Sequence, residues 1–146
     1  MRPAGQTSVS VWIARHTILL WLGVILNATF VVALLIDPRW LLDLLGIPLQ
    51  QLLWARIAGG LMMIVTVFYI PAAVDFGRYR INAYLAVFPA RTFGAVFFFL
   101  AVILFGQPPG FLVASLVDAL IGSTTLYCLI RIKALEERSS ESGIIR

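Results

Sequence analysis

The sequence contains little charge, a single cysteine and a single histidine. Only 12% of its 146 residues are charged, about half the share of an ordinary soluble domain, whereas 61% are hydrophobic. Cys128, having no second cysteine, excludes an intrachain disulfide, a CxxC redox pair and a thiolate metal site. His16 alone excludes haem held by two histidines of one chain. We therefore expect no metal site and no cofactor of the chain's own, although a quinone or lipid could be bound.

Long apolar runs account for most of the chain. Four of them reach the length of about 20 residues that a helix needs to cross a bilayer: 17–36, 52–74, 84–105 and 111–130. The apolar residues do not alternate with a period of two, so the sequence does not indicate barrel strands. The first run is longer than the apolar part of a signal peptide, and no convincing cleavage site follows it, so we interpret it as a retained span. The sequence predicts an all-α integral membrane protein, a single up-down four-helix bundle over residues 1–146.

The segment between the first two runs predicts a short additional helix. It reads IDPRWLLDLLGIP, in which Asp37 suits the N-cap, Pro38 the first helical position and Gly46 the C-terminal stop. These signals bound a helix over about residues 38–45. Because its leucines and Trp40 gather on one face, we expect the helix to lie in the outer membrane interface, with Trp40 as an anchor.

Basic residues are divided unevenly between the two sides that four spans define. One side carries Arg39 alone, and the side of both termini carries Arg2, Arg15, Arg78, Arg80, Arg131, Lys133, Arg138 and Arg146. The positive-inside rule then places both termini in the cytoplasm, with a tail over 131–146 that extends the fourth helix briefly. The net charge of +4 largely reflects this asymmetry, and with no nucleic-acid motif we expect no nucleic-acid partner.

Three ionisable residues, Arg56, Arg91 and Asp118, lie within the predicted spans, where such groups are costly and usually turn inward and pair, and the amide of Asn27 joins them. At about 1.5 Å of rise per residue, Arg56 lies about 6 Å from the outer end of its span, Asp118 about 10 Å, Asn27 about 13 Å and Arg91 about 21 Å. The similar depths predict an ion pair between Arg56 and Asp118, with Asn27 within reach. Arg91 either joins this cluster or extends its side chain towards the cytoplasm.

Small and polar residues recur at helical spacing beside this cluster, as close helix packing in lipid requires. The predicted packing positions are Gly23 on the first span, Gly60 on the second, and Ser115, Gly122 and Thr125 on the fourth. Either the ion pair only locks two helices together, or it lines an outer-facing pocket that holds a carboxylate, a phosphate or a quinone oxygen. No second acid for a proton relay and no nucleophile beside a base is evident, so we assign no catalytic residue.

Five short motifs occur in an order that resembles a known family. They are LLGIP, RIAGG, FYIPAAVDFGRYR, PARTFGA and SLVDAL, and the resemblance covers roughly residues 37–131. Together they resemble the DoxX-like group of small four-helix bacterial membrane proteins. The resemblance implies a bundle in the bacterial inner membrane, in which Arg56, Gly60, Arg91 and Asp118 are the positions to carry over. Named members of the group are associated, as partner subunits, with quinone-linked sulfur oxidation, but fold analogy is a weak basis for function.

Three hypotheses of function follow. The first is a non-catalytic accessory or anchoring subunit of a larger, respiratory membrane complex, whose partners are lipids and other subunits or further copies of the chain. The second is a protein that binds or transports a small molecule, lipid or quinone in an outer-facing pocket around Arg56 and Asp118. The third is a component of a quinone-linked oxidoreductase that needs a cofactor from another chain.

Overall fold

Helices make up almost all of the chain that the structure, a computed structural model, describes, which is residues 4–141. The elements in order are α1 (Ala4–Ile36), α2 (Pro38–Leu44), α3 (Leu52–Val67), α4 (Ile70–Val74), α5 (Arg80–Leu85), the π-helical η1 (Ala86–Arg91), α6 (Thr92–Phe105) and α7 (Phe111–Glu141). No strand occurs in this part of the chain. The charges predicted at Arg2 and Arg146 and the tail positions 142–146 lie outside the described residues.

Four helical stretches are long and apolar enough to cross a membrane, which fits a multi-pass membrane protein. They are Ser8–Ile36, Leu52–Val74, Arg80–Phe105 and Phe111–Glu141. The stretches contain the four predicted runs, but the first and last are longer than the apolar pattern. In particular, α7 continues to Glu141, well beyond the brief extension expected after residue 130. Charged and polar residues can continue a helix whose hydrogen bonds are already propagating, so hydropathy underestimates its length.

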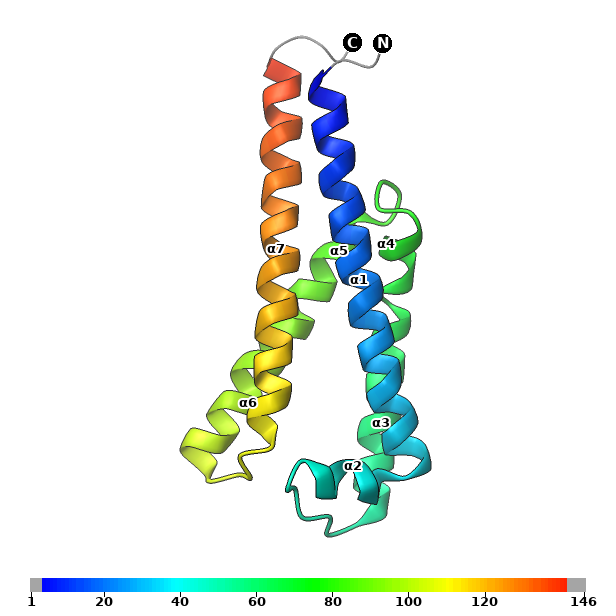
Figure 1. The fold of residues 1–146 in the computed structure, drawn as a ribbon, viewed down its shortest axis with the longest axis vertical. Helices are drawn as coiled ribbons and strands as arrows, with labels where there is room; N and C mark the ends of the chain where they lie inside the picture. The colour runs from blue at the N-terminus through cyan, green and yellow to red at the C-terminus, as the bar shows by residue number, and fades with distance from the viewer. Residues whose placement is uncertain (1–3, 142–146) are drawn as a thin grey trace.

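The two longest helices, α1 and α7, pack against each other and have the described ends of the chain at the same end of the molecule (Figure 1). We call this the termini end, and the opposite end the α2 end. On the sides of this pair, α3 and α4 pack against α1, and α6 packs against α7. The 33 residues of α1 correspond to about 50 Å, more than the ~30 Å of a bilayer core.

The hydrophobic core lies on the side of the termini end. Its buried members come from α1, α4, α5, η1 and α7, with Tyr69 and Phe76 from the adjoining turns: Leu20, Val24, Tyr69, Ala72, Ala73, Phe76, Ala83, Ala86, Val87, Leu129 and Ile132. Four of these are alanines that are at most 4% exposed. Small side chains let helix backbones approach closely, so this half of the bundle, which we call the packed half, is filled by direct helix contact.

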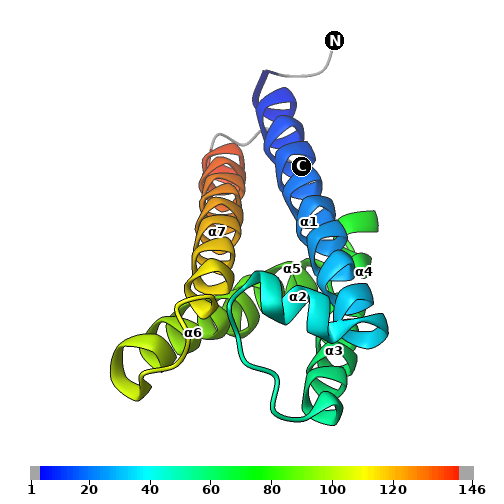
Figure 2. The same cartoon turned by 60° about the horizontal axis from the view of Figure 1, so that its bottom comes forward.

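The predicted short helix is present as α2 and has the expected caps. The Asp37 carboxylate accepts a hydrogen bond from the Trp40 backbone N–H at 3.3 Å, and Gly46 adopts a left-handed φ of 64° just after the helix. Figure 2 shows α2 lying across the α2 end. The turn before α7 approaches the same segment so closely that a Cβ on Gly110 would lie 1.8 Å from the Leu45 carbonyl oxygen.

The second and third apolar stretches are both interrupted near their prolines. The chain leaves α3 at Val67 and restarts as α4 at Ile70, with Pro71 in the first turn. In the third stretch, Phe88 is extended, with φ −116° and ψ 119°, immediately before Pro89. Because proline lacks the backbone donor that continues a helix, both are suited to such breaks. After the second break, α6 packs against α7 but runs away from α1 and α3 (Figure 1), and Arg91 lies at its start.

Candidate functional site

A buried ion pair joins the third and fourth apolar stretches. Arg91 Nη1 donates to Asp118 Oδ1 at 2.5 Å, and the Arg91 side chain is only 7% exposed. Asp118 is on α7, on the side of the pair that faces the α2 end, and its side chain is 20% exposed. A charge in an apolar interior is tolerated when it is paired and hydrogen-bonded, and this pair meets that condition.

The second terminal nitrogen of Arg91 connects the pair to α1. Arg91 Nη2 donates to the Gly23 carbonyl oxygen at 3.3 Å and to Asn27 Oδ1 at 3.2 Å. The Tyr69 ring lies beside the guanidinium, with its centroid 5.7 Å from the Arg91 Cζ atom. Arg91 thus fixes the relative positions of α1, α6 and α7 through one side chain.

Asn27 extends the network to α3. Its side-chain nitrogen donates to Thr66 Oγ1 at 3.2 Å, and the Thr66 hydroxyl in turn donates to the Met62 carbonyl oxygen at 2.7 Å. Both side chains are buried. Because the amide accepts from Arg91 and donates to Thr66, its orientation is determined by its neighbours. We call Asn27, Thr66, Arg91 and Asp118 the polar cluster.

Glycines make room for this cluster between the helices. A Cβ on Gly94 of α6 would lie 2.0 Å from Asp118 Oδ2, and one on Gly23 would lie 2.8 Å from Arg91 Nη2. On α7, a Cβ on Gly122 would lie 3.1 Å from the Cβ of Arg91. Nearby, Ser115 donates to the Ala95 carbonyl oxygen at 2.7 Å, which adds a further link between α6 and α7. The backbones therefore approach one another where the long Arg91 side chain lies.

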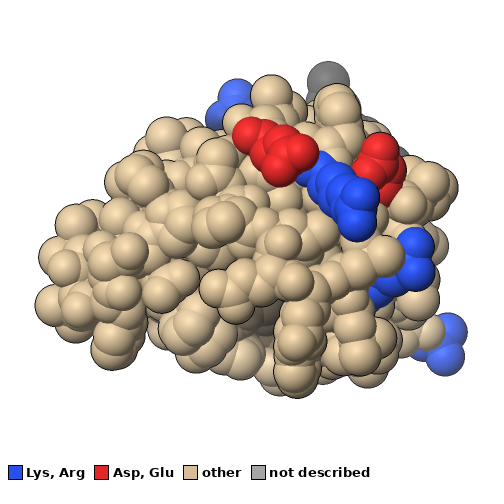
Figure 3. Space-filling model, turned by 90° about the horizontal axis from the view of Figure 1, so that it is seen from below, with Lys and Arg blue, Asp and Glu red and all other residues tan. Residues whose placement is uncertain are grey.

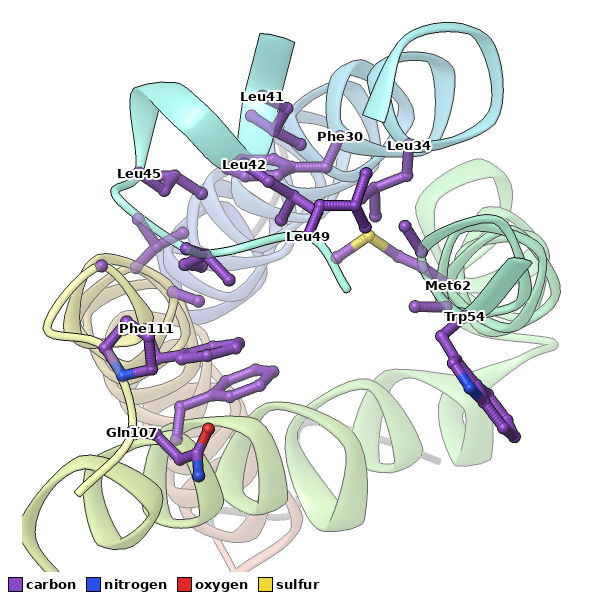
Figure 4. Close-up of a pocket in the computed structure, with 18 of the residues that line it drawn as sticks. Phe30, Leu34, Leu41, Leu42, Leu45, Leu49, Trp54, Met62, Gln107 and Phe111 are labelled. Atoms are coloured by element: carbon purple, nitrogen blue, oxygen red, sulfur yellow. The ribbon is translucent and has the colours of Figure 1, made fainter. Parts of the chain in front are cut away.

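A cavity of about 670 Å³ lies between the polar cluster and the α2 end. Its walls are mostly apolar and come from α1, α2, α3, α6 and α7 with the loop after α2 (Figure 4). Leucines of α2 and its loop lie on one side of it, and Phe98, Phe111 and Met62 lie on others. Among the side chains that line it, only Arg91 and Asp118 are charged. The cavity is therefore an apolar compartment with polar groups at its deep end.

The cavity reaches the surface beside α3. Trp54, which lines it, is 65% exposed and lies on the side of α3 that faces α6 in Figure 4. The exposed, uncharged residues Gln50, Gln51 and Gln107 also line the space. Figure 3 shows the α2 end as a surface with few charged side chains, most of them towards one edge. The approach to the cavity is therefore apolar or uncharged over most of this face.

The predicted pairing of Arg56 with Asp118 is not formed. Arg56 is exposed on α3, and no ion pair or hydrogen bond of its side chain occurs within residues 4–141, whereas the partner of Asp118 is Arg91. The depth estimated along straight spans predicted the wrong partner for Asp118 because it did not locate the two arginines correctly. It could not tell which face of α3 carries Arg56, and it did not include the break at Phe88 or the inclination of α6. Of the two alternatives for Arg91, the structure shows the first, in which it joins the cluster.

The other predicted positions fall into different environments. Gly23, Ser115 and Gly122 contact the cluster or the neighbouring helix as described above. Thr125 is buried, but its hydroxyl has no hydrogen-bond partner in the described chain. Gly60 has nothing within 4 Å of an added Cβ, and its neighbour Gly59 is the one that packs, against Leu34 and Leu35 of α1. Trp40 is 61% exposed on α2.

Sequence reasoning missed Thr66, Tyr69 and Gly94. A signal for Gly94 was available, since it lies one helical turn after Arg91 and is the one glycine of its span. Thr66 and Tyr69 carry no distinctive pattern, because an isolated hydroxyl in an apolar helix usually bonds to its own backbone. His16, also not assigned to the site, is fully buried against Phe76, with ring centroids 5.0 Å apart. No group of three or more His, Cys, Asp or Glu side chains within residues 4–141 is placed to hold a metal ion.

Comparisons with known proteins give no relative for this chain. No family model matches it, no curated protein matches it, and no solved structure matches it. The class defined by the structure is therefore an all-helical protein with four potential membrane spans and an apolar cavity between them.

Proposed function

We propose that this protein binds a membrane-soluble small molecule, such as a lipid or a quinone, in the cavity between the polar cluster and the α2 end. One observation carries the proposal: a cavity of about 670 Å³ has mostly apolar walls and an ordered ion pair at its deep end. Ligand sites of this kind are predominantly apolar, with a few precisely placed polar groups that orient the ligand. The polar end of the ligand would meet Asp118 and Arg91, and its apolar body would lie against the leucines and Phe111.

The proposal includes a membrane topology. We infer an up-down bundle in the bacterial inner membrane, with the termini end in the cytoplasm and α2 in the outer interface. The inference is supported by Arg15, Arg78, Arg80, Arg131 and Lys133 on the loop and helix ends of one side, against Arg39 on the other. The exposed Trp40 on α2 suits an interfacial position. In this orientation the ligand enters from the outer leaflet, beside α3.

Identification of co-purifying small molecules tests the proposed function. The protein is extracted in mild detergent, and native mass spectrometry and solvent extraction identify what remains bound. Ala114→Trp places a large ring in the cavity, which Ala114 lines, whereas Val113→Trp places the same ring on the exposed neighbouring face as a matched control. We expect an apolar molecule to remain on the wild type and on Val113→Trp and to be lost from Ala114→Trp. Equal retention by both variants would contradict binding in the cavity.

A second function, that of an accessory subunit, is favoured by the environment of Arg56. This arginine is exposed on an apolar helix and has no carboxylate partner within residues 4–141. A charge on a lipid-facing surface is stabilised when an acidic group of another chain or a lipid phosphate meets it. If a partner subunit supplies that group, Arg56→Gln releases a stoichiometric partner from the native complex, while Arg39→Gln leaves it bound. If no protein co-purifies with the wild type, the accessory role is wrong.

A further inference from the structure

The polar cluster keeps some hydrogen-bonding capacity that its own members do not use. Arg91 Nη2 has two acceptors, Arg91 Nη1 is bonded to Asp118 Oδ1, and the Asn27 amide is bonded on both sides. Asp118 Oδ2 accepts no hydrogen bond from the described part of the chain, and the Nε–H and one Nη1–H of Arg91 find no acceptor there, although both residues line the cavity. A carboxylate oxygen can accept further hydrogen bonds. The ion pair therefore offers a ligand an acceptor on Asp118 and donors on Arg91, a combination that a hydroxyl group can match because it both donates and accepts.

The charges at this end of the cavity balance. Arg91 contributes one positive charge and Asp118 one negative charge, and no other lining residue is charged. An anionic head group would place a second negative charge beside Asp118, and a cationic one would place a second positive charge beside Arg91. In an apolar interior, such like-charge contacts and the loss of hydration are both costly. An uncharged group that donates a hydrogen bond avoids the like-charge contact and loses much less hydration.

We propose that the cavity selects an uncharged head group with a hydroxyl, carried on a long apolar tail, and that this hydroxyl donates to Asp118 Oδ2. The inference rests on the proposed function and adds to it the chemical class of the ligand. It excludes fatty acids, lipid phosphates and amines as preferred ligands. It also assigns Asp118 two roles, since one oxygen holds Arg91 and the other receives the ligand.

Probes matched in their tails test this selectivity. A long-chain alcohol, carboxylate and amine of one chain length, each with bromine on the chain, are added to the full chain in bilayer nanodiscs of uncharged lipid. Bromine quenches tryptophan emission at short range, and Trp54 lines the cavity. Binding in the cavity is therefore measured as the part of the quenching that is seen in the wild type and is lost in Trp54→Phe. We expect the alcohol to bind wild type about tenfold more tightly than either charged probe. Tighter binding of the carboxylate or the amine would overturn the inference and leave the cavity function intact.

Asp118→Asn provides a change of specificity. It removes the negative charge and leaves Arg91 uncompensated, so the carboxylate should now bind more tightly than the alcohol, a reversal of the wild-type order. Arg56→Gln removes a charge outside the cavity and should keep the wild-type order. A folded Asp118→Asn protein that retains the wild-type order would overturn the inference. If this variant does not fold, the wild-type ranking alone decides. Absence of Trp54-dependent quenching by all three probes would overturn the proposed function together with the inference.

Discussion

The two halves of the bundle are built from the same helices but fill their interiors differently. Towards the termini end, alanines and Leu129 lie between α1, α4, α5 and α7 with almost no exposure. Towards the α2 end, α3 and α6 lie against different members of the central pair, and a cavity of about 670 Å³ separates them. The polar cluster lies where the packed half meets the half that contains the cavity. Small residues therefore close one half, while large residues around a void leave the other half free to bind a ligand.

The boundary between the halves depends most on the ion pair, so its removal should have the largest effect. Arg91→Met leaves Asp118 without its partner in the interior and should lower the free energy of unfolding by about 3 to 5 kcal/mol. Arg56→Met makes the same chemical change on an exposed face and should have a small effect. Thermal unfolding of both variants in one detergent measures the difference. Equal loss of stability in the two variants would mean that the pair does not hold the halves together.

Truncation of leucines compares the two interiors directly. Leu129 is 1% exposed in the packed half, so Leu129→Ala should create a cavity and cost about 2 to 5 kcal/mol. Leu42 already faces the open cavity, so Leu42→Ala removes fewer contacts and should cost clearly less. It should instead weaken retention of the bound apolar molecule. The comparison fails if Leu42→Ala destabilises the protein as strongly as Leu129→Ala does.

The close approach of α6 and α7 can be tested at a single glycine. Gly94→Ala would place a Cβ 2.0 Å from Asp118 Oδ2, so the helices must separate or the carboxylate must move, at a cost of about 1 to 3 kcal/mol. Gly60→Ala meets nothing within 4 Å and should leave stability unchanged or raise it by about 1 kcal/mol, because alanine favours helix. Chemical denaturation of both variants measures the change in the free energy of unfolding and its sign in each. A Gly94→Ala protein as stable as Gly60→Ala would contradict the packing described here.

The smallest expected effect concerns the helix that covers the cavity. Asp37→Ala removes the acceptor for the Trp40 backbone N–H and should destabilise α2 by about 1 kcal/mol. Amide hydrogen exchange in nanodiscs should rise in α2 and stay constant in the packed half. Asp43→Ala, within the same helix, provides a control that keeps the cap. Exchange that rises equally in both variants would show that the cap does not hold α2 in place.

Part of the site was predictable from the sequence, and the wrong prediction, the pairing of Arg56 with Asp118, has a specific reason. The rarity of charged and amide side chains in the apolar runs identified Asp118 and Asn27 as members of an inward-facing set and left the place of Arg91 open, and the structure brings these three together. The choice of partner failed because one-dimensional depth contains no information on which face a residue occupies. Arg56 and Arg91 have similar chemistry, but one faces outward from α3 and the other lies between Gly23 and Gly122.

The short helix α2 is the opposite case. Its bounds follow from Asp37, Pro38 and Gly46, whose effects are local and are set by backbone geometry and one side-chain hydrogen bond. Where α2 lies relative to the other helices is not a local property. The contact of Gly110 with the Leu45 carbonyl links residues far apart in the sequence, and no spacing pattern encodes it.

The sequence by itself therefore determined the helical class, the four apolar stretches and the bounds of α2, because hydropathy and caps act within a few residues. Only the tertiary structure decided that Asp118 pairs with Arg91, that Gly94 is a point of close approach, and that a cavity remains between the pair and the α2 end. Those features depend on the rotation and inclination of whole helices. Such quantities are set by the packing of side chains from distant parts of the chain.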